Sequence, residues 1–281
     1  MARTIYDVAQ SGKVAISPLI KWPGGKRTLA QSILQWVPRK FGTYYEPFLG
    51  GGAVFFALMP DKSVLSDANH ELINAYKHVR DHSADLVRAM RALKNSEEAY
   101  YAVRASAPRT PLRKAARTLY LTRLAFNGIH RVNLQGRFNV PYGYKTHLST
   151  IDEGHLSTAS AALSNATLMS GDFQEITECA QCGDVIYFDP PYTVAHAANG
   201  FVKYNERMFS WQDQERLAQH ARDLAARGCR VIVSNANHAS LHNLYEGFAC
   251  QVVERPSVIA ASSKHRRQIT ECIFVLGETP C

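Results

Sequence analysis

The sequence of 281 residues has no long apolar run. The longest, residues 53–59, has 7 residues, whereas a helix that crosses a bilayer needs about 20. Residues 1–7 lack the apolar stretch of a secretory signal, and the chain shows neither internal repeats nor low-complexity segments. These absences argue against a membrane protein and a fibrous protein. We therefore expect a globular protein of the cytoplasm.

The cysteines do not form the pattern of a disulfide framework, because the six of them are scattered along the chain. Cys179 and Cys182 form one Cys-x-x-Cys motif, which leaves a metal site or a redox pair as an alternative. No second pair follows at zinc-finger spacing. We expect two reduced thiols in a loop before a strand, and no bound metal.

Two glycine motifs that bind phosphate groups are also missing. Gly50-Gly51-Gly52 is not part of a Gly-x-Gly-x-x-Gly motif, since Phe55 stands three positions after Gly52. Residues 25–28 do not form a Walker A loop, because Ile20 stands where its first glycine is required. A ligand at these glycines is therefore not expected to bind through phosphates, and a tight turn without a ligand remains an alternative.

Positive charge is concentrated in one quarter of the chain. The sequence has 32 Lys and Arg against 24 Asp and Glu, a formal net charge of +8. Residues 80–145 hold 13 of the basic and 4 of the acidic residues, a net +9 that leaves −1 for the rest. A polyanionic partner explains this bias better than a solvated face. Aromatic residues in the segment are able to stack on bases, but we expect most of them to fill a small core.

Apolar spacing and turn signals predict alternating strands and helices on both sides of the basic segment. The expected strands are 44–48, 64–66, 166–169, 184–188, 230–234, 248–254 and 271–276. The expected helices are 26–36, one from residue 53, 71–79, one from Pro111, one from the Ser210/Asp213 capping box to Arg227, and 238–246. This order predicts an α/β fold with a mostly parallel sheet and a helical insertion, in which residues 127–144 form an irregular loop or hairpin.

Several polar or glycine-rich segments follow the expected strands directly, so they meet at the ligand-binding edge of a parallel sheet. Asp67 is placed there to take ribose hydroxyls, or alternatively to cap the next helix. The sequence Asp189-Pro190-Pro191-Tyr192 is more specific. Its prolines form a rigid turn that holds a carboxylate and the Pro190 carbonyl as two acceptors for an amino group, with an aromatic face beside them.

Phe48-Leu49-Gly50-Gly51-Gly52 and Asp189-Pro190-Pro191-Tyr192 resemble the S-adenosylmethionine motif and the catalytic motif of amino-methylating DNA methyltransferases. The resemblance extends to further motifs: Lys21-Trp22-Pro23-Gly24-Gly25-Lys26, Ser66-Asp67-Ala68-Asn69, residues 126–133, residues 136–143 and Gly171-Asp172-Phe173. Over residues 21–276 the chain thus resembles the Dam-type (D12 class) family of DNA adenine-N6 methyltransferases.

This resemblance implies a Rossmann-like methyltransferase fold with S-adenosylmethionine as cofactor. The catalytic domain would comprise residues 1–79 and 151–281, and the target-recognition domain residues 80–150. The cofactor-binding residues would be Trp22, Lys26, Phe48, Gly50, Gly52, Asp67, Asp172, Phe173 and Asp189.

The resemblance also implies direct methyl transfer to N6 of an adenine that is flipped out of double-stranded DNA. Asp189 and Pro190 would hold N6, and Tyr192 would stack on the base. The DNA-binding residues would be Lys21, Asn127, Arg131, Asn133, Arg137 and Pro141. Lys21 and Arg131 match positions that read GATC in the family. We expect double-stranded DNA as the partner, and neither a membrane nor an obligate protein partner.

Three alternatives remain open at this point: methylation of cytosine N4, methylation of an RNA adenine, and a DNA-binding protein without activity. The aspartate before Pro190 favours adenine over cytosine, where serine is often found. The recognition loop favours DNA over RNA, and the intact Asp189–Tyr192 turn favours an active enzyme.

Overall fold

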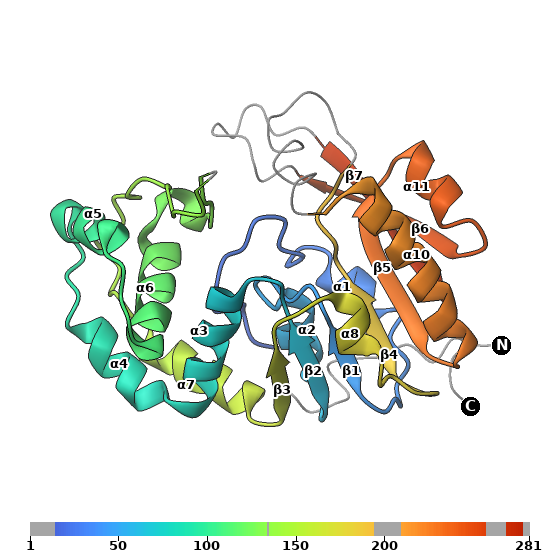
Figure 1. Cartoon of the computed structure of the whole chain (residues 1–281), viewed down its shortest axis with the longest axis horizontal. Helices are drawn as coiled ribbons and strands as arrows, with labels where there is room; N and C mark the ends of the chain where they lie inside the picture. Colours follow the sequence, from blue (N-terminus) through green and yellow to red (C-terminus); the bar gives the residue numbers. More distant parts are fainter. Residues whose placement is uncertain (1–14, 134, 194–208, 257–267, 278–281) are drawn as a thin grey trace.

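The computed structural model describes residues 15–133, 135–193, 209–256 and 268–277. A sheet of 7 strands in the order β3-β2-β1-β4-β5-β7-β6 forms its centre (Figure 1). The strands are β1 (Tyr44–Glu46), β2 (Ser63–Ser66), β3 (Ala166–Met169), β4 (Val185–Phe188), β5 (Arg230–Ala236), β6 (Ala249–Pro256) and β7 (Gln268–Leu276). β1 to β5 are parallel, whereas β7 runs antiparallel between β5 and β6. The predicted mostly parallel α/β fold is confirmed.

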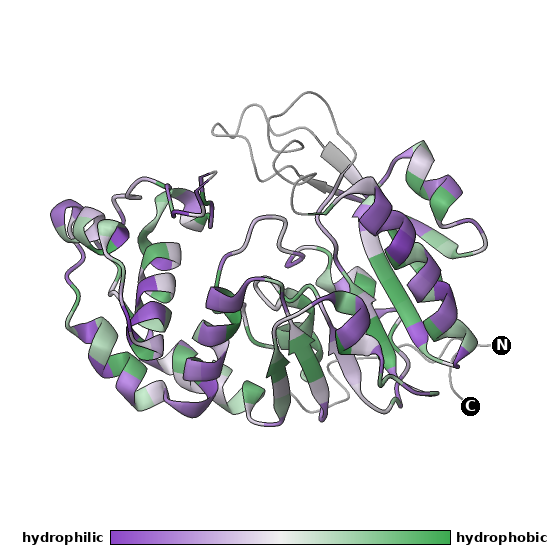
Figure 2. Ribbon diagram, viewed as in Figure 1, coloured by the Kyte–Doolittle hydropathy of each residue, from purple (hydrophilic) through white to green (hydrophobic). Residues whose placement is uncertain are grey.

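Helices cover both faces of this sheet. Successive side chains of a strand point to opposite faces, so they pack into two different cores. In β4, Val185 and Tyr187 join the core that contains α1 (Ala30–Leu34), α2 (Ala53–Leu58) and α3 (His70–Asp81). Ile186 and Phe188 join the core beneath α8 (Phe173–Thr177), α10 (Trp211–Ala226) and α11 (Ala239–Leu244). Figure 2 accordingly shows most of β5 as hydrophobic and the helices as mixed.

A helical lobe lies beside the β3 edge of the sheet (Figure 1). It consists of α4 (Ser83–Arg91), α5 (Glu97–Ala105), α6 (Pro111–Leu124), the short 3-10 helix η2 (Phe126–Gly128) and α7 (Glu153–Leu163). Its buried side chains, among them Leu86 and Tyr120, belong to the same core as Leu65 of β2. The lobe therefore shares its core with one face of the sheet.

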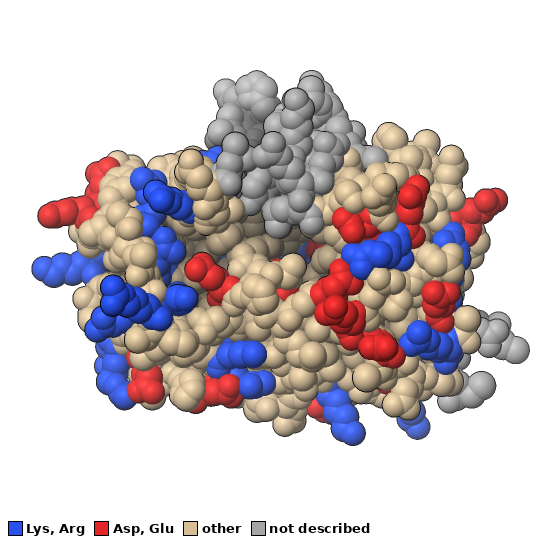
Figure 3. All heavy atoms as spheres, in the orientation of Figure 1, with Lys and Arg blue, Asp and Glu red and all other residues tan. Residues whose placement is uncertain are grey.

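Residues 125–142 form a hairpin at the end of α6, as the sequence predicts. The bridges Ala125–Tyr142 and Val132–Phe138 join its two arms. Most aromatic residues of the basic segment are buried as expected, although Phe126 and Tyr144 are 47% and 63% exposed. In the view of Figure 3, Lys and Arg side chains gather over this lobe.

Two local predictions need correction. The helix expected over residues 26–36 is limited to α1, because Lys26 turns inward as a buried side chain and residues 36 and 37 close the helix with 3-10 bonds before Pro38. The cap of α3 is Asn69, whose side chain accepts from the N–H groups of Glu71 and Leu72, so Asp67 is not the cap. The Ser210/Asp213 capping box of α10 is confirmed.

No helix among the described residues combines the length and the apolar content needed to cross a bilayer.

Candidate active site and nucleic-acid interface

Asp67 fastens the glycine turn after β1 to the end of β2. Its Oδ2 accepts the N–H of Gly50 at 3.0 Å, and its Oδ1 accepts the N–H of Asn69 at 2.9 Å. Burial raises the pKa of Asp67, and the two backbone donors oppose that shift. Each carboxylate oxygen has a second lone pair, so the side chain keeps acceptor capacity at the sheet edge.

The glycine turn lies directly against the segment that carries Trp22. A Cβ on Gly50 would stand 2.8 Å from Cδ1 of Trp22, and one on Gly51 would stand 2.6 Å from the carbonyl oxygen of Ile20. Gly50 also has a left-handed φ of +48°. The structure therefore brings Trp22, Gly50 and Asp67 together, and only glycine fits at the point of contact.

Glu46, at the end of β1, is a buried acid that the sequence interpretation did not single out. Its Oε2 accepts the hydroxyl of Tyr44 at 2.8 Å and the N–H of Phe55 at 3.0 Å. Burial raises its pKa to about 8, so the carboxyl is mostly protonated at neutral pH. An acid immediately before Pro47 and Phe48 was a visible signal for this position.

Asp189 follows β4 and receives two side-chain donors. Its Oδ1 lies 2.7 Å from Nζ of Lys26 and accepts the hydroxyl of Ser234 at 2.8 Å. The side chain of Lys26 is 4% exposed and also donates to the carbonyl of Gly24 at 2.8 Å. Burial raises the pKa of Asp189, and the Lys26 ammonium opposes the shift.

Tyr192 is held by a second buried acid, Glu271 of β7. The phenol of Tyr192 donates to Oε2 of Glu271 at 2.7 Å, and Nζ of Lys26 lies 4.9 Å from the centroid of its ring. Oε2 of Glu271 is also 4.0 Å from Nζ of Lys26. Lys26 thus stands between two carboxylates and an aromatic ring. The sequence interpretation missed Glu271, whose only signal was one charged residue in an apolar strand.

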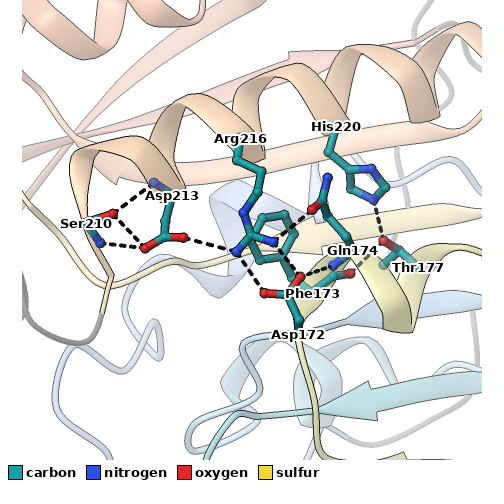
Figure 4. Close-up of polar contacts among 8 residues, drawn as sticks. All are labelled: Asp172, Phe173, Gln174, Thr177, Ser210, Asp213, Arg216 and His220. Atoms are coloured by element: carbon teal, nitrogen blue, oxygen red, sulfur yellow. Dashed lines mark hydrogen bonds and ion pairs between the residues drawn. The ribbon is translucent and has the colours of Figure 1, made fainter.

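Asp172 and Phe173 are fixed by Arg216 of α10 (Figure 4). The guanidinium donates to both carboxylate oxygens of Asp172 at 2.8 Å and lies 4.4 Å from the centroid of the Phe173 ring. Burial favours a raised pKa for Asp172, but the hydrogen bonds from Arg216 and from the Gln174 N–H lower it overall. Arg216 is a further residue that sequence reasoning missed.

Phe48 packs into the same region as Phe173. Its ring centroid lies 5.7 Å from that of Phe173, 5.5 Å from Phe209 and 6.3 Å from Phe188. The structure therefore places an aromatic wall between the ends of β1 and β4. Together with Asp172, this wall provides an apolar face and a carboxylate that suit a flat heterocyclic ring.

The N-terminal segment reaches the 125–142 hairpin through two neighbouring residues. The ring of Trp22 stacks on that of His130, with centroids 4.4 Å apart and planes 18° apart. A Cβ on Gly128 would stand 2.7 Å from Cδ of Lys21. Burial, reinforced by the charge of Arg117, lowers the pKa of His130 to about 4.

The expected DNA-binding residues of the hairpin divide into exposed side chains and residues that shape the backbone. Arg131 and Arg137 are exposed, and Nε of Arg131 donates to Oδ1 of Asn139 at 2.8 Å. Asn133 closes the hairpin turn, since its Oδ1 accepts the N–H groups of Gln135 and Arg137 at 3.0 and 2.9 Å.

Two further positions support the base of the hairpin. Asn127 has a left-handed φ of +53°, and the carbonyl of Pro141 accepts the N–H of Phe126 at 2.9 Å. A pocket of about 340 Å³ lies between α6 and the hairpin residues His130, Val132 and Phe138. Lys114 and Arg117 contribute positive charge to its lining.

The two thiols of the Cys179/Cys182 motif are exposed in the loop between α8 and β4, as predicted.

The sheet order, with one antiparallel strand between β5 and β6 and a polar site at the strand ends, defines a Rossmann-like methyltransferase fold.

Comparison with known proteins identifies the family. A family model described as "D12 class N6 adenine-specific DNA methyltransferase" matches residues 22–259. The type II methyltransferase M1.LlaDCHI of Lactococcus lactis subsp. cremoris is 36% identical over 277 residues, which cover 95% of this chain and 98% of the relative. A DNA adenine methylase of Haemophilus influenzae is 31% identical, with coverage of 94% and 95%.

The chain belongs to the D12 class of N6 adenine-specific DNA methyltransferases. This membership confirms the predicted enzyme class and decides against cytosine N4, RNA and an inactive DNA-binding protein.

Proposed function

We propose that this enzyme uses S-adenosylmethionine to methylate N6 of an adenine flipped out of double-stranded DNA, with GATC as the recognition sequence. The observation that carries the proposal is the cluster of Lys26, Asp189, Tyr192 and Glu271 at the end of β4, beside the glycine turn. It supplies acceptors, a cation and an aromatic face in one place. We also propose that the enzyme works in the cytoplasm and needs no obligate protein partner.

The residues around this cluster fit the cofactor. Asp67 offers acceptor capacity to ribose hydroxyls, and the wall of Phe48 and Phe173 suits an adenine ring. Trp22 borders the glycine turn, and Lys26 supplies a cation for a carboxylate. The fit includes a methionine carboxylate because Lys26 has three N–H donors, two of which serve Gly24 and Asp189. When bound, the cofactor supplies an electrophilic methyl group on sulfur.

The chain's own residues prepare the amine of the target base. The N6 lone pair of adenine is delocalised into the ring, so the amine is a poor nucleophile. The Asp189 carboxylate and the Pro190 carbonyl would accept the two N6 hydrogens and favour a pyramidal nitrogen, whose lone pair is then available for methylation. Catalysis rests on this positioning and on the electrostatics of a buried site, without a covalent intermediate.

Lys26 and Ser234 both contact the Oδ1 atom of Asp189, so a shift of Lys26 away from this carboxylate would strengthen it as an acceptor for the amine. Glu271 offers the alternative, since its Oε2 lies only 4.0 Å from the ammonium. We infer that Lys26 moves from Asp189 toward Glu271 and the cofactor carboxylate when the base enters. Glu271 meanwhile orients Tyr192, which stacks on the flipped base.

The exposed Arg131 and the neighbouring Lys21 are suited to read guanine edges in the major groove. Arg137 and the other cations of the helical lobe would contact phosphates, which fix the register without reading sequence. Asn127, Asn133 and Pro141 would hold the hairpin in the shape that presents these side chains.

Incubation of the purified chain with labelled S-adenosylmethionine and duplex DNA, followed by nucleoside analysis, tests the proposal. We expect N6-methyladenine in a duplex with GATC and none in a matched duplex in which that site is scrambled. Label in both duplexes would overturn the site assignment, and absence of label from DNA would overturn the whole proposal. Asp189→Ala should lose methyl transfer and keep DNA binding, whereas the exposed Asp223→Asn should keep both.

A further inference from the structure

A second cluster of reactive side chains lies on the other side of β7 from Glu271. His242 of α11, Cys250 of β6 and Cys272 of β7 each direct one ligand atom into it, and these atoms all lie within 4.8 Å of one another. Cys272 is buried in the core beneath α10 and α11, whereas Cys250 is exposed. Nothing in the proposed methyl transfer uses these three residues.

The spacing of the cluster is close to that of a tetrahedral metal site. With Zn–S bonds of about 2.3 Å and Zn–N bonds of about 2.0–2.1 Å, ligand atoms around one zinc ion lie roughly 3.5–3.8 Å apart. In the structure, Sγ of Cys250 lies 4.0 Å from Nδ1 of His242, and one ligand atom of each of the three residues lies within 4.8 Å of the others. Side-chain shifts of about 1 Å or less would therefore bring these atoms to the spacing of zinc ligands.

Asn237 sets the orientation of the imidazole. Its Oδ1 lies 2.7 Å from Nε2 of His242, so that nitrogen donates a proton to the amide oxygen. A neutral ring then carries its lone pair on Nδ1, the nitrogen that faces Cys250. Metal-binding histidines characteristically donate their other N–H to a carbonyl or a carboxylate in this way.

We propose that His242 Nδ1, Cys250 Sγ and Cys272 Sγ form a binding site for a thiophilic divalent cation of the zinc type. Two thiols and one imidazole select such an ion over Mg²⁺ or Ca²⁺, which prefer oxygen ligands. The exposed Cys250 gives the ion access from solvent, and water completes the fourth position.

A disulfide is the competing use of the two thiols, and the strand register argues against it. Cys250 pairs with Phe274 and Cys272 pairs with Val252, so the two cysteines are diagonal neighbours on β6 and β7. Diagonal residues on antiparallel strands are about 7–8 Å apart, beyond the usual Cα spacing of about 4.4–6.8 Å for a disulfide.

The bound ion would tie α11, β6 and β7 together. Glu271 immediately precedes Cys272 and therefore points to the opposite face of β7, where it holds Tyr192. The site would thus stabilise the strand that supports the catalytic cluster from behind. Its role would be structural, because none of its ligands faces the active site.

Cobalt titration of the reduced, chelator-treated full chain tests the proposal. We expect one Co²⁺ per chain, with the charge-transfer absorption of thiolate coordination, and its displacement by Zn²⁺. Cys250→Ser and His242→Ala should lose this absorption, and Zn²⁺ should raise the Tm of the wild-type protein but not of these variants. The matched control is Cys179→Ser/Cys182→Ser, which removes the other cysteine pair and should behave as wild type.

Three results would overturn the site. The first is absence of thiolate absorption in the wild-type protein. The second is loss of this absorption in the Cys179→Ser/Cys182→Ser control but not in Cys250→Ser. The third is a Cys250–Cys272 disulfide, found by peptide mass mapping of protein purified without reductant. Cys281, outside the described residues, is kept in every variant and cannot cause a difference between them.

Discussion

The indole of Trp22 stacks on the imidazole of His130, with ring centroids 4.4 Å apart. Trp22 also contacts the glycine turn, and His130 belongs to the hairpin that carries Arg131. One aromatic pair thus connects the proposed cofactor site to the proposed DNA-reading surface.

Removal of this stack by His130→Ala should lower the free energy of unfolding by about 0.5–1.5 kcal/mol. His130→Phe should keep most of that energy. Since the pKa of His130 falls from 6.5 to about 4 on folding, the wild-type protein should also lose stability as pH drops from 6.5 to 4. Urea unfolding at several pH values checks both effects. The exposed His147→Ala is the control, and an equal pH slope in His130→Phe would contradict the assignment.

Glu271→Gln should lower kcat and leave the affinity for DNA nearly unchanged. The amide still accepts from Tyr192, but it removes the negative charge toward which Lys26 would move when it releases Asp189. Single-turnover methylation, measured beside equilibrium DNA binding, separates the two quantities. Unchanged single-turnover rates would show that Lys26 does not need this acceptor.

Arg131→Ala should cost about 1–3 kcal/mol in binding to the cognate site and relax discrimination at one base pair. The side chain is exposed on the hairpin, and only Asn139 holds it among the contacts of the described residues. Competition binding with duplexes that differ at single positions measures the effect. Arg88→Ala, a charge-matched change on α4, should leave discrimination intact. A uniform loss on all duplexes would instead make Arg131 a phosphate contact.

Arg216→Ala should weaken binding of S-adenosylhomocysteine by up to about tenfold, or about 1.4 kcal/mol. The guanidinium fixes the carboxylate of Asp172 and covers Phe173. The side chains of Arg216 and Asp172 are both over a third exposed, so solvent screens this ion pair. Calorimetric titration measures the change. Arg222 lies on the same helix but contacts Phe248 instead, so Arg222→Ala provides the control. Equal losses in the two variants would indicate damage to α10 rather than to the cofactor site.

Glu46→Gln should flatten the dependence of stability on pH. Burial raises the pKa of Glu46 from 4.5 to about 8, so the folded chain keeps a proton that the unfolded chain releases. The wild-type free energy of unfolding should therefore fall as pH rises from 4.5 to 8, by at most about 1.4 kcal/mol per pH unit. Urea unfolding of both proteins across this range gives the slopes. Parallel slopes would show that Glu46 is ionised in the folded state.

The sequence predicts the sheet and one edge of the site because both depend on local signals. Most strands lie in short apolar runs. Asp67 and Asp189 directly follow strands and Asp172 comes three residues after β3, so their positions at the edge follow from topology. The bounds expected for the first helix were wrong, and so was the alternative that Asp67 caps α3. Both depend on which side chain turns inward or reaches a backbone N–H.

Glu271 and Arg216 were out of reach for a different reason. Their partners Tyr192 and Asp172 lie 79 and 44 residues away in the chain, so only the assembled sheet and α10 bring them together. The His242, Cys250 and Cys272 cluster is another long-range product, formed by the register of β6 and β7. No spacing rule in the sequence predicts such contacts.

The apolar core that runs without a break from the sheet into α4–α6 limits how this enzyme can diversify. The helical lobe cannot be exchanged as a separate unit, because a lobe grafted from a relative would bring core side chains that do not pack against this sheet. Substitutions are better accommodated at exposed hairpin positions such as Arg131 and Arg137. New sequence preferences would therefore arise through substitutions at such positions, while the lobe and the catalytic body are inherited as one unit.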